Sequence, residues 1–117
     1  MKYYQGDDIN FSIDIKQVAG SGTDWSFFPS VVVYLYTHLS YIVKFKKEAQ
    51  EGYELLQVSK DLMTFTGKLT PDQTRKMKGA LKMSIRVVDE NGDTSTKDID
   101  TGIRIAETPI KYEQYEL

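Results

Sequence analysis

Only a few side chains in this sequence have the types and spacing that a chemical reaction requires. The chain holds one histidine and no cysteine, so a serine-histidine-aspartate triad would have to be built around His38 and a two-histidine metal site cannot form. The neighbours of His38, "THLS", place it at the end of a predicted strand and favour an ordinary surface histidine. The sequence therefore predicts a protein that is not an enzyme, with no catalytic residue and no cofactor.

The segment "DENGD" carries oxygen ligands at alternate positions, Asp89, Asn91 and Asp93, which is the spacing that opens a calcium-binding loop. Such a loop needs glycine at its sixth position, where this chain has Thr94, and helices rather than strands on either side. Asn91-Gly92 is instead typical of a type I′ hairpin turn, in which both central residues need a positive φ. We predict a hairpin here and no metal site, and calcium binding by the three oxygen-bearing residues stays open as the alternative.

The charged residues are mixed along the chain. Fifteen basic and seventeen acidic residues give a formal net charge of -2, and no basic patch of the kind that binds nucleic acid is expected. Asp7 and Asp8 stand before the first predicted strand, where their charge suits the protection of a strand edge better than general acid-base catalysis. Two basic clusters are expected to face solvent, one on a strand and one at the end of a helix: Lys44, Lys46 and Lys47, and Arg75, Lys76 and Lys78.

Alternation of apolar and polar residues places most of these side chains on β-strands. In "INFSIDI" every second residue is apolar, which predicts a half-buried strand at about 8–16. In "TPDQTRKMKG" the N-cap residue Thr70, Pro71 at the first helical position and Gly79 after the last predict one helix at about 70–78. Further strands are expected at about 30–37, 41–47, 53–58, 62–69, 80–88 and 93–100, and around Ile103 and Ile105 the last strand either bends at Gly102 or gives way to another.

About seven short strands and one short helix predict an all-β fold, an immunoglobulin-like antiparallel β-sandwich, with a small open barrel as the rival architecture. The chain of 117 residues is expected to form one domain over 1–107, followed by a polar tail over 108–117. The longest apolar run, "VVVYLY", is far shorter than the ~20 residues of a membrane helix, and "MKYYQGDD" lacks the apolar region of a secretory signal. We therefore expect synthesis in the cytoplasm without a signal peptide, and no membrane partner.

Tyrosine is in surplus, with eight in 117 residues, and it is a side chain that interfaces favour. Both faces of the strand at 30–37 are apolar, although the core needs only one. In the immunoglobulin-type order this strand lies between those at 41–47 and 80–88, so we predict an interaction surface on the outer face of that sheet, formed by Val32, Tyr34, Tyr36, Ile42 and Val88. The alternative is that the loop at 17–29, with Trp25, Phe27 and Phe28, covers this face within the same chain.

The order of the elements resembles a known family. "YYQGDD" leads into "INFSIDI", followed by "VVVYLY", then "GKLTPDQTRKMKGALKMSIRVVDENGD" and "TSTKDIDTGIRI". This is similar to the immunoglobulin-like domain at the N-terminus of the upper baseplate proteins of tailed phages, which recurs in other virion proteins of phages and prophages. The resemblance covers nearly the whole chain. Two features depart from it: the first loop reads "AGSGTDWSFFPS" in place of a "G-x-P-x-D-L" linker, and there is no long C-terminal extension of the kind that carries the trimer-forming region.

The resemblance implies a function that the residues alone do not establish. It implies a non-enzymatic structural module of a phage or prophage particle, in the baseplate, tail, neck or head decoration, that acts by protein-protein contact. Its partners would be other virion proteins or further copies of itself in a homo-oligomer, and not nucleic acid. Phage proteins are made in the host cytoplasm and released by lysis, which agrees with a virion protein that needs neither signal peptide nor disulfides. The alternative is a carbohydrate- or surface-binding module that uses exposed tyrosines.

Overall fold

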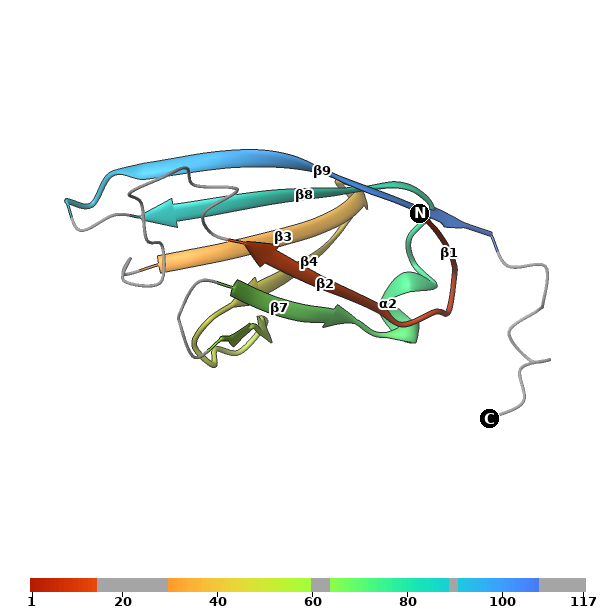
Figure 1. Cartoon of the computed structure of the whole chain (residues 1–117), viewed down its shortest axis with the longest axis horizontal. Coiled ribbons are helices and arrows are strands. Elements are labelled where there is room, and N and C mark those ends of the chain that lie inside the picture. The colour runs from red at the N-terminus through yellow and green to blue at the C-terminus, as the bar shows by residue number, and fades with distance from the viewer. Residues whose placement is uncertain (15–29, 60–63, 89–90, 108–117) are drawn as a thin grey trace.

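The computed structural model describes residues 1–14, 30–59, 64–88 and 91–107. These residues form two β-sheets and one short helix, and the sheets face each other across one hydrophobic core (Figure 1). The larger sheet has the strand order β1-β9-β8-β3-β4-β5 and the smaller has the order β2-β7-β6. The predicted all-β sandwich is therefore confirmed. The strands are β1 Lys2–Tyr4, β2 Ile9–Asp14, β3 Ser30–His38, β4 Tyr41–Lys46, β5 Glu54–Leu55, β6 Gln57–Val58, β7 Thr64–Leu69, β8 Gly79–Val88 and β9 Thr94–Ala106.

The core lies between β3 and β8 of the larger sheet and β2 and β7 of the smaller one. On β8 the inward residues Leu81, Met83, Ile85 and Val87 are all buried, as their alternation predicts for the inner face of a central strand. From the smaller sheet, the Phe11 ring makes an edge-to-face contact with Phe45 at 5.0 Å between centroids. A Cβ added at Gly67 would collide with the Phe11 ring, so the glycine makes room for this aromatic contact.

The first strand, β1, was not predicted from the sequence. It runs parallel to β9, with Lys2 paired with Arg104. The chain then reverses in a tight turn, in which the Asp7 N–H donates to the Tyr4 carbonyl at 3.0 Å and Gly6 has a φ of 91°. A positive φ at the third residue is the requirement of a type II turn, and glycine meets it without strain. The tyrosine-glycine-acid opening of the sequence is thus a short strand and the turn that leads into β2.

The helix is shorter than predicted. It covers one turn, Pro71–Thr74 (α2), where the sequence predicted about 70–78. Its start is confirmed, because Thr70 accepts a bond from the Gln73 N–H and Gln73 accepts one from the Thr70 N–H, which completes a capping box. Its end was predicted wrongly, because a helix of two turns is marginal without tertiary support and the chain instead buries Met77 fully in the core.

The β8-β9 hairpin is confirmed, but the predicted two-residue type I′ turn is wrong. Val88 pairs with Thr94, so an odd number of residues, 89–93, lies between these paired positions. A two-residue turn always leaves an even number between paired positions, and the register is therefore shifted by one residue. Gly92 still has a positive φ of 85°. Strand β9 continues through Gly102, at a φ of 69°, which is the bent-strand alternative.

The single strand predicted at about 53–58 is two short strands in different sheets. Strand β5 runs parallel to β4, whereas β6 pairs with β7 in antiparallel fashion. Leu56, between them, is 2% exposed and packs in the core where the chain crosses from one sheet to the other. The predicted pairing with the following strand is confirmed for β6. The turn predicted at 59–61 lies partly outside the described residues, and the loop at 17–29 and the tail at 108–117 lie wholly outside them.

Candidate interaction surface

The candidate site is the outer face of the larger sheet. Strand β3 lies between β4 and β8, which is the arrangement predicted from the sequence. Because side chains alternate along a strand, Val33 and Leu35 are fully buried in the core and Tyr34 and Tyr36 point to the opposite face. Tyr36 is paired with Ile42 of β4. The structure therefore brings the predicted tyrosines and Ile42 together on one surface.

The five predicted surface residues differ in how much of each side chain is accessible. Tyr34 and Tyr36 are half-buried, and Ile42 is 38% exposed. Val32 is only 7% exposed, so the expectation that it contributes accessible area is wrong: it supports the tyrosines from within the sheet. Val88 is half-buried and paired with the first residue of β3, which places it at the end of the surface rather than beside the tyrosines.

Charged side chains form rows along the strands on either side of the tyrosines of β3. The register places basic side chains of β4 and β8 on both sides of the tyrosine row of β3, and acidic side chains of β9 beyond β8. Sequence reasoning missed these rows, because which charges become neighbours depends on the register between strands and not on spacing along one of them. We call this surface the tyrosine face; it comprises Val32, Tyr34, Tyr36, Ile42, Lys44, Lys46, Lys82, Ser84, Arg86, Asp98 and Asp100.

A chain of hydrogen bonds orients side chains from three strands of the tyrosine face. The Ser84 hydroxyl donates to the Asp98 carboxylate at 2.7 Å. Since that hydroxyl has one proton, the Tyr36 hydroxyl, 3.2 Å from the Ser84 oxygen, is the donor in the second bond. The Tyr36 hydroxyl is thereby fixed by Ser84 of β8, and the Ser84 hydroxyl is fixed by Asp98 of β9. A surface in which rotamers are already fixed loses less conformational entropy when a partner binds.

On the other side of the tyrosine row, the two lysines of β4 gather around a further aromatic ring. The Lys44 and Lys46 amines lie 5.1 and 4.6 Å from the centroid of the Tyr53 ring, within the range of a cation-π interaction. Lys46 also donates to the Gln50 side chain at 2.6 Å. Leu55, paired with Lys46, is 56% exposed. The rim of the tyrosine face is thus made of amines with aliphatic and aromatic surface between them.

The other residues that sequence reasoning examined are not brought together. His38 is exposed at the end of β3, with Nδ1 2.9 Å from the Ser40 hydroxyl, as predicted for a surface histidine. Asn91 and Asp93 are exposed at the β8-β9 hairpin, and Asp89 lies outside the described residues. Within the part of the chain that the structure describes, no group of three or more histidine, cysteine or acidic side chains is arranged to hold a metal ion.

The acidic pair at the start of β2 has structural partners. The Asp7 carboxylate accepts a bond from the Tyr4 N–H at 2.9 Å, and Asp8 lies 3.4 Å from the Lys68 amine of the neighbouring strand. Both acids are exposed. Asp8 directly precedes β2, which is an outer strand of the smaller sheet among the described residues. This position agrees with the predicted role of charge at a strand edge.

The basic cluster near the helix is used within the fold. Arg75 pairs with Asp72 at 2.5 Å, and Lys78 pairs with Glu107 at 3.1 Å. The Lys76 amine lies 5.2 Å from the centroid of the Tyr41 ring. Because α2 ends at Thr74, these residues follow the helix and do not stand in its last turn as predicted. Lys47, which follows the end of β4, pairs with Glu48 at 3.8 Å.

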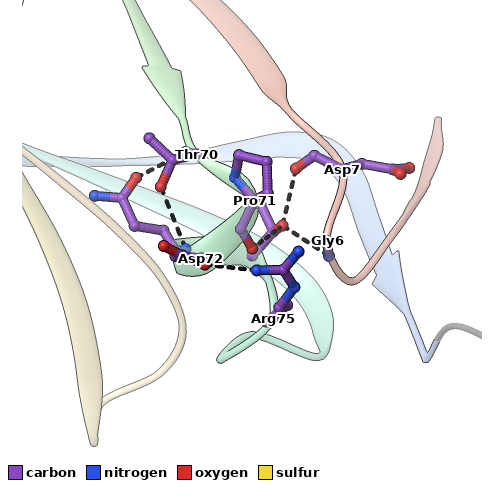
Figure 2. A network of polar contacts seen from close by, with 8 residues as sticks. Gly6, Asp7, Thr70, Pro71, Asp72 and Arg75 are labelled. Carbon is purple, nitrogen blue, oxygen red and sulfur yellow. Dashed lines mark hydrogen bonds and ion pairs between the residues drawn. The ribbon is translucent and has the colours of Figure 1, made fainter. Parts of the chain in front are cut away.

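A polar corner joins the start of the chain to α2 (Figure 2). Among the described residues, Thr74 is the one buried residue with a polar side chain. Its hydroxyl lies 2.8 Å from the Asp7 carbonyl and accepts a bond from the Gly6 N–H at 3.0 Å. The Gln5 side chain donates to the Met77 carbonyl at 2.9 Å on the other side of the turn. These bonds satisfy backbone groups that no sheet ladder serves, so the corner is structural.

Tyr41 is the first residue of β4, and the carboxylates of Glu54 and Asp72 act on its phenol. Partial burial raises the pKa of the Tyr41 phenol above its ordinary value of 10.0, and the carboxylates of Glu54 and Asp72 raise that pKa further. The phenol is therefore neutral at physiological pH. A neutral phenol against the core is a packing group with a hydrogen-bonding tip.

Two hollows lie beside the smaller sheet. One, of about 590 Å³, is lined from both sheets and includes Phe11, Phe45, Leu55 and Lys68. The other, of about 400 Å³, runs between β2 and β9, where Ile13, Met83 and Ile103 form part of an apolar wall. The acid of the first hollow is Glu54, and Lys68 lines the same hollow; the acids of the second are Asp14 and Asp100.

Comparisons with known proteins do not place the chain in a family: no family model, curated protein or solved structure matches it. A search of the described residues for helices long and apolar enough to cross a membrane finds none. The assignment of function therefore rests on the tyrosine face and on the resemblance drawn from the sequence.

Proposed function

We propose that this protein is a non-enzymatic structural module of a phage or prophage particle, and that it acts by protein-protein contact through the tyrosine face. The observation that carries the proposal is the tyrosine row of β3, with Tyr34 and Tyr36 half-buried between two rows of basic side chains. Protein interfaces combine an aromatic centre with a polar rim in this way. No cofactor is needed for such a role.

The character of the exposed residues supports contact with a protein. Ile42 and Leu55 are 38% and 56% exposed on or beside this face, and burying them in a complex is favourable at about 25 cal/mol per Å² of apolar area. The lysines of β4 would lie at the edge of the contact, where charges select a partner and set its orientation more than they add affinity.

The placement in a virion rests on the resemblance given above. The features that carry the resemblance are used in the fold: "YYQGDD" forms β1 and the turn into β2, and "TPDQ" forms the capped helix between β7 and β8. A two-sheet module of this kind offers a rigid face on which other particle proteins, or further copies, can be fixed.

A carbohydrate-binding role remains the alternative. A sugar ring needs an open aromatic face to stack on, and Tyr53 already has two lysine amines within 5.1 Å of its ring centroid. Tyr34 and Tyr36 are half-buried by their neighbours. These contacts favour a protein partner over a glycan.

The test is the double variant Tyr34→Glu with Tyr36→Glu, introduced into the phage or prophage that carries the gene. The expected result is a protein that stays folded by circular dichroism but is missing from purified particles, in which an antibody detects the wild-type chain. The matched control, Asn10→Glu with Ser12→Glu, adds the same charge to two exposed positions of the smaller sheet and is expected to enter particles normally.

Two results would contradict the proposal. One is the absence of the wild-type chain from purified particles, and the other is normal incorporation of the double variant. Unfolding of the double variant would show that the tyrosines are covered within the chain, which is the alternative raised from the sequence. Binding to a glycan array that the tyrosine substitutions abolish would establish the carbohydrate-binding role instead.

A further inference from the structure

We propose that the tyrosine face binds a second copy of the same chain, related by a two-fold axis that runs parallel to the strands and passes between β3 and β8. This inference rests on the proposed function, because it takes the tyrosine face as the contact surface. It adds the identity of a partner, the symmetry of the contact and the residues that pair across it.

The two edges of the tyrosine face carry opposite charge. Across one level of the sheet the register runs from Asp98 on β9 through Ser84 and Tyr34 to Lys44 on β4. The next level runs from Asp100 through Lys82 and Tyr36 to Ile42. One edge of the face is therefore acidic and the other is basic, and the tyrosines lie between them. A surface with both signs at opposite edges can be complementary to itself.

Symmetry restricts how two such faces meet, because a two-fold contact is isologous and each surface patch meets the same patch of the other copy. An axis perpendicular to the strands would lay β4 on β4 and β9 on β9, which opposes like charges in both rows. An axis along β3 itself would lay the basic row of β8 on the basic row of β4. Like charges facing each other in an interface cost several kcal/mol, so these arrangements are disfavoured.

An axis parallel to the strands and midway between β3 and β8 avoids these conflicts. It lays β4 of one copy over β9 of the other, and β3 over β8. At the level of Tyr34, Lys44 of each copy then faces Asp98 of the other. At the next level, the Lys82 amine faces the Tyr36 ring, which is the geometry of a cation-π contact. Strands of two packed sheets stay within about 30° of alignment, so these neighbours are kept.

The two reciprocal ion pairs lie at the rim and the tyrosines at the centre. From β4 to β9 there are three strand intervals of about 4.8 Å, so the two Lys44-Asp98 pairs stand about 14 Å apart across the face. Lys44 and Asp98 are both exposed in the single chain, and Asp98 is held in place by its bond from Ser84. The arrangement gives a small contact, at the low end of specific interfaces, which dissociates on dilution.

The test uses charge reversal in the full chain. Light scattering after size exclusion, and sedimentation, are expected to show a wild-type mass that rises from 13.4 kDa toward twice that value as the protein concentration increases. Lys44→Asp and Asp98→Lys are each expected to weaken this association by about tenfold or more, because each places like charges opposite one another. Circular dichroism confirms that each variant is folded.

Mixing the two variants gives the decisive measurement. In a heterodimer of Lys44→Asp with Asp98→Lys both ion pairs are again attractive, so an equimolar mixture is expected to regain association close to the wild-type value. The matched control reverses an exposed pair on the smaller sheet, with Lys68→Asp and Asp8→Lys, whose charged atoms lie 3.4 Å apart. Neither control variant is expected to change the mass.

Three outcomes overturn the inference: a wild-type chain that stays monomeric at every concentration, single variants that associate like the wild type, or a mixture that does not regain association. None of them depends on virion assembly. A monomeric wild type that is still found in particles, and lost from them with the tyrosine variant, would leave the proposed function intact and refute only the two-fold contact.

Discussion

Replacing Thr74 by valine tests the polar corner that holds the start of the chain against α2. Valine keeps the shape and the β-branching of threonine but removes the hydroxyl, which lies 2.8 Å from the Asp7 carbonyl and accepts from the Gly6 N–H at 3.0 Å. An unsatisfied buried group costs about 1–3 kcal/mol. Asp7 is exposed, so water replaces the bond to its carbonyl, and one full penalty remains for the half-buried Gly6. We expect Thr74→Val to lose about 1–3 kcal/mol, which corresponds to a fall in Tm of about 5–15 °C for a domain of this size.

Urea denaturation measures this loss, and hydrogen exchange locates it. The amide of Gly6 is expected to exchange faster in Thr74→Val, while the amides of β8 change only as much as the global stability does. The matched control is Thr66→Val, whose half-buried hydroxyl is 3.5 Å from the Gln57 carbonyl and is expected to contribute less than about 0.5 kcal/mol. An unchanged urea midpoint together with unchanged exchange at Gly6 would refute the reasoning.

Three further predictions concern the core, the hairpin and the phenol of β4. Ile85→Ala empties a site that is 1% exposed and is expected to cost about 2–5 kcal/mol; a loss below about 1 kcal/mol in urea would show that this face is not tightly packed. Gly92→Val, at a φ of 85° with no atom within 4 Å of the added Cβ, is expected to cost about 1–3 kcal/mol through backbone strain alone, and an equal denaturation midpoint would contradict it. Because the folded-state pKa of Tyr41 lies above 10.0, the unfolded chain ionises first, so its stabilising contribution is complete below pH 10.0 and is lost as pH rises through the raised pKa. Tyr41→Phe is expected to reduce the loss of stability in this range, and a parallel pH profile for the variant would argue against the raised pKa.

The parts of the fold that were predicted correctly are those with a long and regular sequence signal. Alternation along β4 and β8 identified these strands and the faces they bury, and the order of β3 between β4 and β8 followed from the fold class. The helix start was predicted because its capping residues are local. Each of these signals is contained in a short window of the sequence.

The parts that were missed depend on contacts between distant segments. Strand β1 has three residues and no alternation that distinguishes it, and it exists because β9 offers a partner. Gly79 predicted a helix end, but it is the first residue of β8 with a φ of 109°, since the burial of Met77 ends the helix earlier. The one-residue shift of the β8-β9 hairpin likewise reflects the register of the whole ladder rather than the turn residues.

The candidate surface was predicted only in part for the same reason. The tyrosines of β3 could be placed on one face by counting along a single strand. The low exposure of Val32, and the position of Asp98 three strands away from Lys44, require the register of neighbouring strands. Such information is not contained in the spacing of residues along one segment.

The parallel pairing of β1 with β9 has a consequence for the order of folding. The Met1 amino group donates to the Gly102 carbonyl at 2.8 Å across 101 residues of sequence, whereas β8 and β9 are joined by a short loop. Closing a longer loop costs more entropy, and local contacts form sooner than distant ones, so we expect the hairpin to form early and β1 to dock last. Until it docks, the backbone edge of β9 at residues 104–106 is open to pairing with other chains. We therefore expect β1 to be the last strand to join this sheet, and its detachment to expose the edge of β9 to pairing between molecules.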